Sequence, residues 1–232
     1  MSIVMGSSDG TLVAVTPYEV LWKCRLSEVL KQDEQSSENS MLSITAVHRY
    51  HMQNSTADAS YIIVADSEKR IHLFQNGRLV MTMNVPSVVT SMCSGFFVNE
   101  GSSDTLNQNN SSPVKGQRFK GDDQVMLATK SGALFVMSNF NIVLYTNLSY
   151  AVTNIKLLPA TGAEDVDAVV CSGYFNKLCI LQNRRCVCSY GTGDWVHTFD
   201  MISEEYGTGE YPLIVVGCLD GSLKLLKINK VT

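Results

Sequence analysis

The chain has 232 residues, of which 45% are hydrophobic and 17% are charged, and its formal net charge is −4. A chain of this length and composition can bury a sizeable apolar core. The negative charge, without any basic stripe interleaved with aromatic residues, argues against nucleic acid as a partner. No apolar run approaches the length of a membrane span, and the start lacks a charged signal-peptide region, so we expect a cytoplasmic protein without a transmembrane segment.

A thirteen-residue hairpin recurs five times along the chain. Each copy has an apolar strand that narrows to a small residue, a tight turn and a second apolar strand, and the small residues are Gly6, Ala65, Ala128, Ser172 and Gly217. Four turns end on residues that tolerate positive φ, namely Gly10, Gly132, Asn176 and Gly221, and Lys69 is the exception. Repeats at this interval predict an array or a propeller.

The repeat unit extends beyond the hairpin. A further strand follows it, and another strand with an apolar-threonine start precedes the next copy, as at Ile44-Thr45, Val89-Thr90 and Val152-Thr153. Val196-His197-Thr198 takes this place in the last copy. Four short strands per unit describe a propeller blade with the Val-Thr strand innermost. The predicted fold class is all-β, a β-propeller of about five four-stranded blades.

We expect a single propeller domain over 1–232. Its repeat units are predicted at about 1–30, 41–85, 86–150, 151–191 and 192–232. Equivalent small residues are 44 or 45 residues apart in the last two steps, but 59 and 63 apart in the first two. Polar insertions at about 31–40 and 99–123 account for the excess length, and we expect them to be flexible because they cannot bury enough apolar surface.

The first and last units are each a strand short. The sequence starts in the second strand of a unit and stops after the third strand of the fifth, which gives about eighteen strands. Three interpretations remain open: an incomplete propeller that another subunit completes, a part of a longer protein, or a five-bladed ring with two thin blades. Open edge strands invite pairing, so we predict that other protein subunits add strands at these edges.

Candidate partner-binding residues lie at the open edges and at exposed aromatic turns. The edge candidates are Ile3, Val4, Met5, Leu223, Leu225 and Ile228, and the turn candidates are Tyr18, Phe140 and Tyr174. Each aromatic candidate also has a plain interpretation as turn filler.

The sequence predicts no catalytic, cofactor or metal site. Nucleophile, phosphate-loop and zinc-protease motifs are missing, and the four histidines are scattered. We expect His197 in the core or lining a channel. An enzyme or small-ligand-binding propeller that uses His197, Asp194 and Glu164 at a central channel is the alternative function. The acidic groups Glu164, Asp165 and Asp167, and Asp122-Asp123, lack the alternating oxygen ligands of a calcium site.

Seven cysteines lie mostly within apolar strands, where free thiols behave as small hydrophobic groups in a reducing compartment. Cys186 and Cys188 are expected to face one side of a strand, which would bring three thiols together with Cys179. Their spacing does not match a zinc site, so we expect packing. The sequons at Asn54, Asn109 and Asn147 are interpreted as polar loop residues.

The order of polar turn, apolar strand, small residue, turn, glycine and apolar strand, with a Val-Thr-Ser segment, resembles the amino-terminal propellers of the Bardet-Biedl syndrome proteins that form the BBSome coat. The stretches that carry the resemblance are RIHLFQNGRLVMTMNVPSVVTSMCSGFF (70–97) and QVMLATKSGALFVM (124–137). It implies a non-catalytic scaffold in a larger assembly, with ciliary trafficking at the cilium or basal body as its most specific version. The repeat pattern is also similar to that of propellers in the lysosomal nutrient-sensing scaffold KICSTOR and in degenerate WD40 proteins. This second resemblance implies a nutrient-sensing complex on lysosomes as the alternative assembly.

Overall fold

The computed structural model describes residues 2–30, 42–54, 57–98, 124–160, 166–202 and 212–228, with the side chains of 52–54 and 57–59 excepted. These residues form eighteen strands in five antiparallel sheets of three or four strands and one short helix. The predicted all-β class is confirmed. The insertions expected at 31–40 and 99–123 lie outside the described residues.

Each sheet is a meander of strands consecutive in the chain. The first contains β1 (Ile3–Gly6), β2 (Thr11–Val15) and β3 (Val20–Arg25), and helix α1 (Leu26–Leu30) follows it. The second contains β4 (Ile44–Asn54), β5 (Ala57–Asp66), β6 (Arg70–Gln75) and β7 (Arg78–Asn84). The third contains β8 (Val89–Gly95), β9 (Gln124–Thr129), β10 (Ala133–Ser138) and β11 (Asn141–Asn147).

The last two sheets follow the same plan. The fourth contains β12 (Val152–Leu158), β13 (Ala168–Gly173), β14 (Phe175–Gln182) and β15 (Arg185–Gly191). The fifth contains β16 (Val196–Ile202), β17 (Leu213–Cys218) and β18 (Leu223–Lys227).

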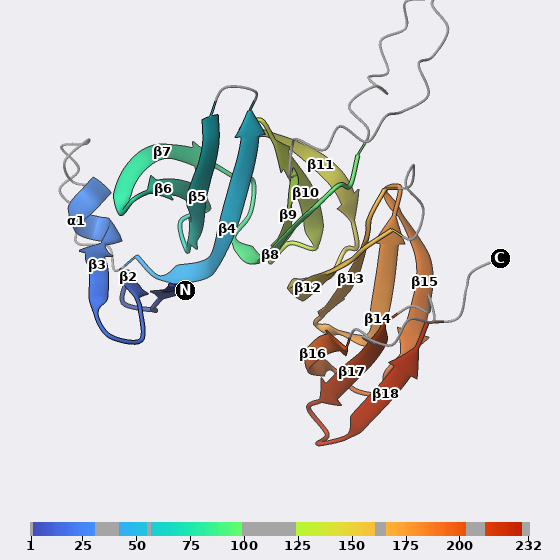
Figure 1. Ribbon diagram of the computed structural model, residues 1–232. Helices are drawn as coiled ribbons and strands as arrows, with labels where there is room; N and C mark the ends of the chain where they lie inside the picture. The colour runs from blue at the N-terminus through green and yellow to red at the C-terminus, as the bar shows by residue number, and fades with distance from the viewer. Residues whose placement is uncertain are drawn as a thin grey trace, which may run out of the picture.

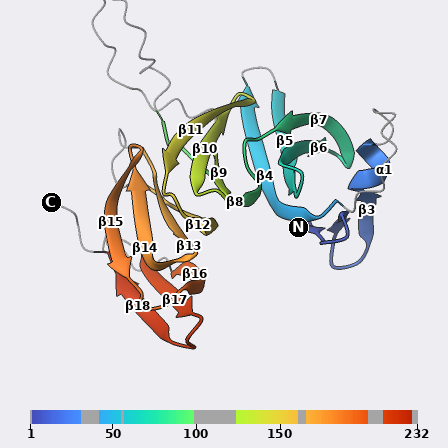
Figure 2. The same ribbon diagram turned by 180° about the vertical axis from the view of Figure 1, so that it is seen from behind.

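The five sheets are arranged in chain order as an open arc (Figure 1). The first sheet, in blue, and the fifth, in red, lie on opposite sides of the opening, and the view from behind shows the same arrangement (Figure 2). The interpretation as a closed five-bladed ring is therefore wrong for the described residues. Within the described ranges, β1 has no inner neighbour and β18 has no outer neighbour.

Apolar clusters fill the spaces between consecutive sheets. Side chains alternate between the two faces of a strand, so a sheet with a neighbour on both sides buries both faces. The cluster between the first two sheets includes Leu12 and Phe74, and the one between the third and fourth includes Leu134 and Val169. Strand β9 is accordingly buried at all six residues. Each sheet thus depends on its neighbours for its core.

The inner strands share one irregularity, a register shift around their second residue. It separates Ile44 from Ala46, Val89 from Ser91, Val152 from Asn154, and Val196 from Thr198. Such a bulge turns the extra residue out of the regular ladder. Thr90, in this position, donates from Oγ1 to the carbonyl of Ala128 in its own sheet and to that of Val152 in the next. The predicted Val-Thr strand therefore links neighbouring sheets.

The hairpin turns differ from expectation at two residues. Gly10, Gly132 and Gly221 have positive φ as predicted, with values of 80°, 90° and 81°. Lys69, the expected exception, also has positive φ, at 61°. Asn176 does not, because the fourth hairpin is tighter: Gly173 pairs directly with Phe175, so Asn176 already lies within β14.

Candidate interaction surface

Equivalent repeat positions are buried in the inner sheets and exposed at the β18 end of the arc. Leu223 is 76% exposed and Leu225 is 62% exposed. The residues at the position of Leu223 in the other four sheets are at most 3% exposed, and they are Leu12, Ile71, Leu134 and Leu178. These counterparts pack against the sheet that follows theirs. We call the exposed pair the β18 face.

The opposite end shows the same contrast. Met5 is 50% exposed and Ile3 is 53% exposed. The counterparts of Met5 are all 0% exposed, and they are Val64, Leu127, Cys171 and Val216. They pack against the sheet that precedes theirs. Ile3 and Met5, which we call the β1 face, are therefore exposed because no described sheet covers this side.

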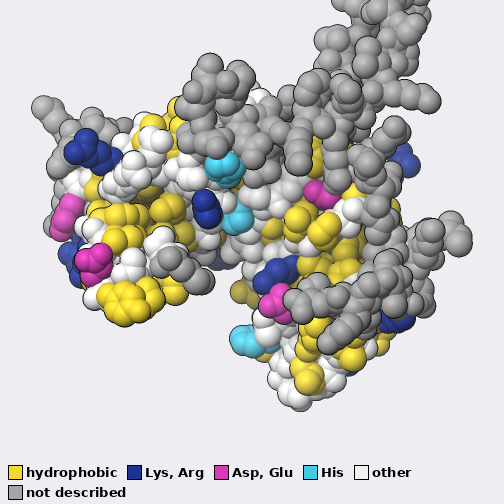
Figure 3. Space-filling view, viewed as in Figure 1, with side chains coloured by type: hydrophobic (Ala, Val, Ile, Leu, Met, Phe, Trp, Pro, Cys, Tyr) yellow, Lys and Arg dark blue, Asp and Glu magenta, His cyan; other side chains and the backbone are white. Residues whose placement is uncertain are grey.

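Figure 3 shows hydrophobic side chains on both sides of the opening of the arc, with basic and histidine side chains between them and also toward its outer parts. Exposed apolar patches on proteins commonly mark interaction sites. The two ends are therefore the strongest candidates for contact with other protein.

The other predicted partner-binding residues lie in different surroundings. Val4 packs into the cluster between the first two sheets, and Ile228 packs against the one between the last two. Tyr18 is 95% exposed in the turn before β3. Tyr174 is also exposed, and its ring centroid lies 5.4 Å from that of Trp195. Phe140 is half-buried against Tyr61, so it belongs to the packing between the second and third sheets.

A groove of about 480 Å³ lies between the first and second sheets. Its wall from the first sheet includes Ser2 and Val4, and its wall from the second includes His48, Arg49 and Tyr61. Among the described residues that line it, Arg49 is the one fully charged side chain and none carries a carboxylate. The groove therefore favours a neutral or acidic group over a basic one.

Polar side chains on the inner strands bind one another across sheets. The Nε2 atom of His48 lies 2.6 Å from Oγ of Ser94, and burial lowers the pKa of His48. Lys156 forms an ion pair with Asp200 at 3.2 Å. A hydrogen bond from the Met201 backbone N–H, followed by the one from Lys156, holds the pKa of Asp200 below its ordinary value. These pairs connect neighbouring inner strands.

The residues of the alternative channel site are not assembled. His197 is exposed on β16, so it does not lie in the core. Asp194 accepts a hydrogen bond from the backbone N–H of Trp195, and no hydrogen bond or ion pair joins Asp194 to His197. Glu164 lies outside the described residues.

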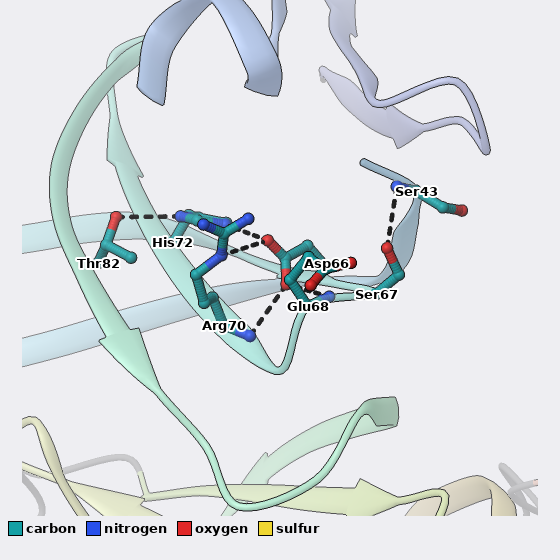
Figure 4. A network of polar contacts seen from close by, with 7 residues as sticks. All are labelled: Ser43, Asp66, Ser67, Glu68, Arg70, His72 and Thr82. Carbon is teal, nitrogen blue, oxygen red and sulfur yellow. Dashed lines mark hydrogen bonds and ion pairs between the residues drawn. The ribbon is translucent and has the colours of Figure 1, made fainter. Parts of the chain in front are cut away.

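The second sheet contains a buried polar network that was not predicted from the sequence (Figure 4). Asp66 and His72 are both fully buried, and Nε2 of His72 lies 3.0 Å from Oδ2 of Asp66. The same oxygen accepts from Nε of Arg70 at 2.9 Å, and Oδ1 accepts from the backbone N–H groups of Glu68 and Arg70. Nδ1 of His72 reaches Oγ1 of Thr82 on β7 at 3.0 Å. The network joins β5, β6 and β7 and has no access to solvent at Asp66, so it stabilises the sheet.

Three thiols converge in the fourth sheet, but not the predicted three. Cys171 on β13 lies opposite Cys179 on β14, and their free thiols form a hydrogen bond. Cys186 on β15 also forms a hydrogen bond with Cys179, whereas Cys188 does not join them. The hydrogen bond from Cys171 lowers the pKa of Cys179 to about 7. In the described part of the chain, no group of three or more His, Cys, Asp or Glu residues is placed to hold a metal ion.

The acidic groups and sequons also have structural surroundings where they are described. Both carboxylate oxygens of Asp167 accept backbone N–H groups, from Phe96 at 2.8 Å and from Ala160 at 2.9 Å. Oδ1 of Asn147 accepts from the N–H of Ser149 in a turn. The other candidates, or their side chains, lie outside the described residues: Asn54, Asn109, Asp122, Asp123, Glu164 and Asp165. Helix α1 has five residues, and the described ranges contain no helix with the length and apolar character needed to span a bilayer.

Comparison with known proteins identifies the fold. No family model matches the chain, and no curated protein matches it in sequence. Among solved structures, the complex of BBS1N with ARL6DN matches at a TM-score of 0.55 and 9% identity, over 97% of this chain and 73% of that one. The WD40 β-propeller domain of Doa1 matches at 0.61 and 15%, and Sqt1 of Saccharomyces cerevisiae matches at 0.64 and 12%.

The chain spans 61% of the Doa1 chain and 56% of the Sqt1 chain, while 99% of it is covered in each comparison. The predicted likeness to WD40 propellers, with a Bardet-Biedl amino-terminal propeller among the matches, is confirmed at the level of fold. Identities of this size carry the fold alone, and one propeller fold hosts many functions.

Proposed function

We propose that the chain is a non-catalytic protein-interaction scaffold, a subunit or accessory protein of a larger multiprotein assembly. The observation that carries the proposal is the exposure of the β1 face and the β18 face at positions where every other sheet is buried. Burying these apolar side chains against another protein removes them from water and is favourable. WD40 propellers are commonly scaffolds of this kind.

The polar groups of the inner strands support the non-catalytic part of the proposal. His48 binds Ser94, and Lys156 binds Asp200, so these side chains connect sheets. The Asp66–His72 pair is sealed from solvent. A catalytic acid or base must reach its substrate, and the Asp66–His72 pair cannot, because neither side chain is exposed.

The more specific setting we propose is BBSome-like ciliary trafficking, in the cytoplasm and at the cilium or basal body. Its support is the likeness to BBS1N, which was solved in complex with ARL6DN. Proximity labelling in ciliated cells tests the setting. Enrichment of ciliary transport proteins over a propeller of unrelated function is expected, and equal labelling of both would refute it while leaving the scaffold proposal intact.

The scaffold proposal is tested by purifying the tagged chain from cells under native conditions, followed by quantitative mass spectrometry and light scattering. We expect at least one stoichiometric partner protein. The double variant Leu223→Glu/Leu225→Glu removes the apolar β18 face and should lose that partner. Recovery of the unmodified chain as a monodisperse monomer without a stoichiometric partner would contradict the proposal.

A matched control is available on the outer strands. Val80 on β7 and Val143 on β11 are each 54% exposed but lie in complete sheets. The variant Val80→Glu/Val143→Glu carries the same added charge and should retain the partner. Loss in both double variants would indicate a general effect of charge and would count against the end faces as the binding surface.

A further inference from the structure

We infer that the free edge of β1 and the groove beside it accept an antiparallel strand of a partner protein, with the pattern apolar–threonine–small–apolar followed by an acidic side chain. The inference rests on the proposed scaffold function and specifies what a partner presents at this end of the arc. Strand addition of this kind combines main-chain hydrogen bonds with side-chain pockets.

The first observation is a hydrogen bond that four sheets make and the first does not. The residue two positions after the small repeat residue donates its backbone N–H, at 2.9 Å in each case, to the carbonyl just before the inner strand. The donors are Ser67, Lys130, Tyr174 and Leu219, and the acceptors are Ser43, Val88, Ala151 and Trp195. Ser8 takes this position in the first sheet, and it has no such acceptor among the described residues.

The orientation of the β1 backbone groups agrees with the missing acceptor at Ser8. The N–H of Ser7 bonds to the carbonyl of Thr11, on the side of β2. Backbone groups of alternate residues in an antiparallel strand point to opposite sides. The N–H and C=O groups of Val4 and Gly6 therefore point away from β2, toward the free edge.

The second observation is that the other four sheets fix the register of such a strand. In each, the bulge after the first residue sets the third residue of the inner strand opposite the small repeat residue. The fourth residue is apolar and lies opposite the counterpart of Met5, in the pairs Val47–Val64, Met92–Leu127, Ile155–Cys171 and Phe199–Val216. The same register on β1 sets the third residue opposite Gly6 and an apolar fourth residue opposite Met5.

The third observation is that the groove lies where the next side chains would point. By the same register, the fifth and seventh residues of the added strand lie opposite Val4 and Ser2, which both line the groove. In the second and fourth sheets, the seventh inner-strand residues Tyr50 and Leu158 are buried, at 1% and 5% exposure. The 480 Å³ groove is the corresponding space beside the first sheet.

The charge of the groove indicates which side chain the fifth residue of the added strand carries. Arg49 lines the groove, and no carboxylate stands beside it among the described lining residues. A partner strand with aspartate or glutamate in the fifth position complements this cation, whereas a lysine repels it. This complementarity distinguishes the first sheet from the fourth, where the fifth inner-strand residue is Lys156 and its partner is Asp200.

The probe is a fluorescein-labelled peptide of residues 150–158 of this chain that carries Lys156→Asp. It contains the pattern Val-Thr-Asn-Ile followed by the acidic residue. We expect saturable binding in fluorescence anisotropy with the whole 232-residue chain. Peptides with the scrambled sequence, or with the original lysine, should bind at least about tenfold more weakly. Equal binding of the scrambled peptide would overturn the inference, as would the absence of saturable binding.

Two variants of the chain separate the backbone from the side chain. Val4→Pro removes the N–H that points to the free edge and leaves the hydrogen bonds to β2, a substitution that edge strands tolerate. Val4→Ala removes more of the side chain than Val4→Pro does but keeps the N–H, so it controls for lost packing of Val4. We expect Val4→Pro to bind the peptide at least about tenfold more weakly than Val4→Ala. Equal affinity in the two variants would refute strand addition.

Hydrogen exchange on the unmodified chain covers the case in which Val4→Pro fails to fold. The amides of Val4, Gly6 and Ser8 should exchange more slowly with peptide bound, and those of β18 should not change. Protection at β18 in place of β1 would overturn the assignment. Light scattering on the chain alone tests a second copy as the occupant: a dimer that Val4→Pro dissociates would replace the partner strand.

These outcomes are separable from those of the proposed function. If the peptide fails to bind while stoichiometric partners still purify with the chain, the strand inference fails and the scaffold stands. If no partner purifies with the chain, the scaffold proposal fails whatever the peptide does.

Discussion

Nε2 of His72 lies 3.0 Å from Oδ2 of Asp66, and neither side chain has any exposed surface. Burial alone would raise the pKa of Asp66. The hydrogen bonds from His72 and from the Arg70 backbone, together with the charge of Arg70, outweigh burial and lower the pKa. The ionised carboxylate is therefore the form that the second sheet is built around.

Replacing this carboxylate should weaken the whole sheet. In Asp66→Asn an amide NH₂ replaces an oxygen that accepts from Arg70 and His72, so the folded state loses about 3 kcal/mol. Urea unfolding followed by tryptophan fluorescence measures the change. Asp220→Asn, at an exposed turn aspartate, is the control and should shift stability by less than about 1 kcal/mol. Equal effects in the two variants would contradict a structural role for the buried network.

The same pair predicts how stability depends on pH. Because the folded-state pKa of Asp66 is lowered, its contribution is complete above the unfolded value of about 4 and is lost as pH falls through the folded pKa. The unmodified chain should therefore lose more unfolding free energy between pH 5 and pH 3 than Asp66→Asn does. Urea midpoints at a series of pH values provide the test, and parallel curves would show that Asp66 is not the titrating group.

Gly173 is the position where a side chain should be least tolerated. A Cβ atom built there overlaps the carbonyl oxygen of Ala151, an atom of the backbone that cannot move aside cheaply. Gly173→Ala should therefore destabilise the chain by about 3 kcal/mol or more. Gly191→Ala, with nothing within 4 Å of its Cβ, should cost less than about 1 kcal/mol. Thermal unfolding of the two variants checks the contrast, which would disappear if the fourth hairpin were wider.

The cysteines should divide by exposure in native alkylation. Cys188 is exposed, so iodoacetamide at neutral pH should label it first; Cys186 is also exposed, but burial and the neighbouring Cys179 raise its pKa, so it should follow more slowly. Cys93 is buried, and burial raises its pKa to about 12, so it should stay unlabelled until the chain unfolds. Peptide mass spectrometry, with and without urea, measures the extent of alkylation at the exposed and at the buried cysteines. Rapid native labelling of Cys93 would mean that the contact between the third and fourth sheets opens readily.

Much of the fold could be predicted because the same local sequence pattern recurs in each repeat. Alternating apolar residues and a small residue recur in every copy, and a turn glycine recurs in three of the five, so these local signals agree on the strand positions. The Val-Thr strand could be placed innermost by its position before each hairpin. The exposure of Leu223 could not be predicted from the sequence, since Leu12 follows a similar turn, Asp-Gly-Thr in place of Asp-Gly-Ser, and is buried.

The prediction about the thiols failed for a geometric reason. Residues i and i+2 share a face only in a regular ladder, and the pairing of β14 with β15 contains a register shift. Cys188 lies opposite Ile180, whereas Cys186 lies opposite Leu181, on the side of Cys179. The Asp66–His72 pair was missed for a similar reason, since a hairpin turn brings together residues that show no periodic pattern.

The linkage of each sheet to its neighbours has a consequence for how the chain opens. An array in which every unit is stabilised by the units beside it loses structure from its ends, where a unit has one neighbour in place of two. Backbone amides of the third sheet, which is enclosed on both faces and lies farthest from the ends, should then exchange most slowly with solvent. The terminal sheets should open first. Occupying the β1 end would raise the local free energy of opening there and pass part of that gain to the adjacent sheet, so a binding event at β1 would register as slower exchange in β4 to β7.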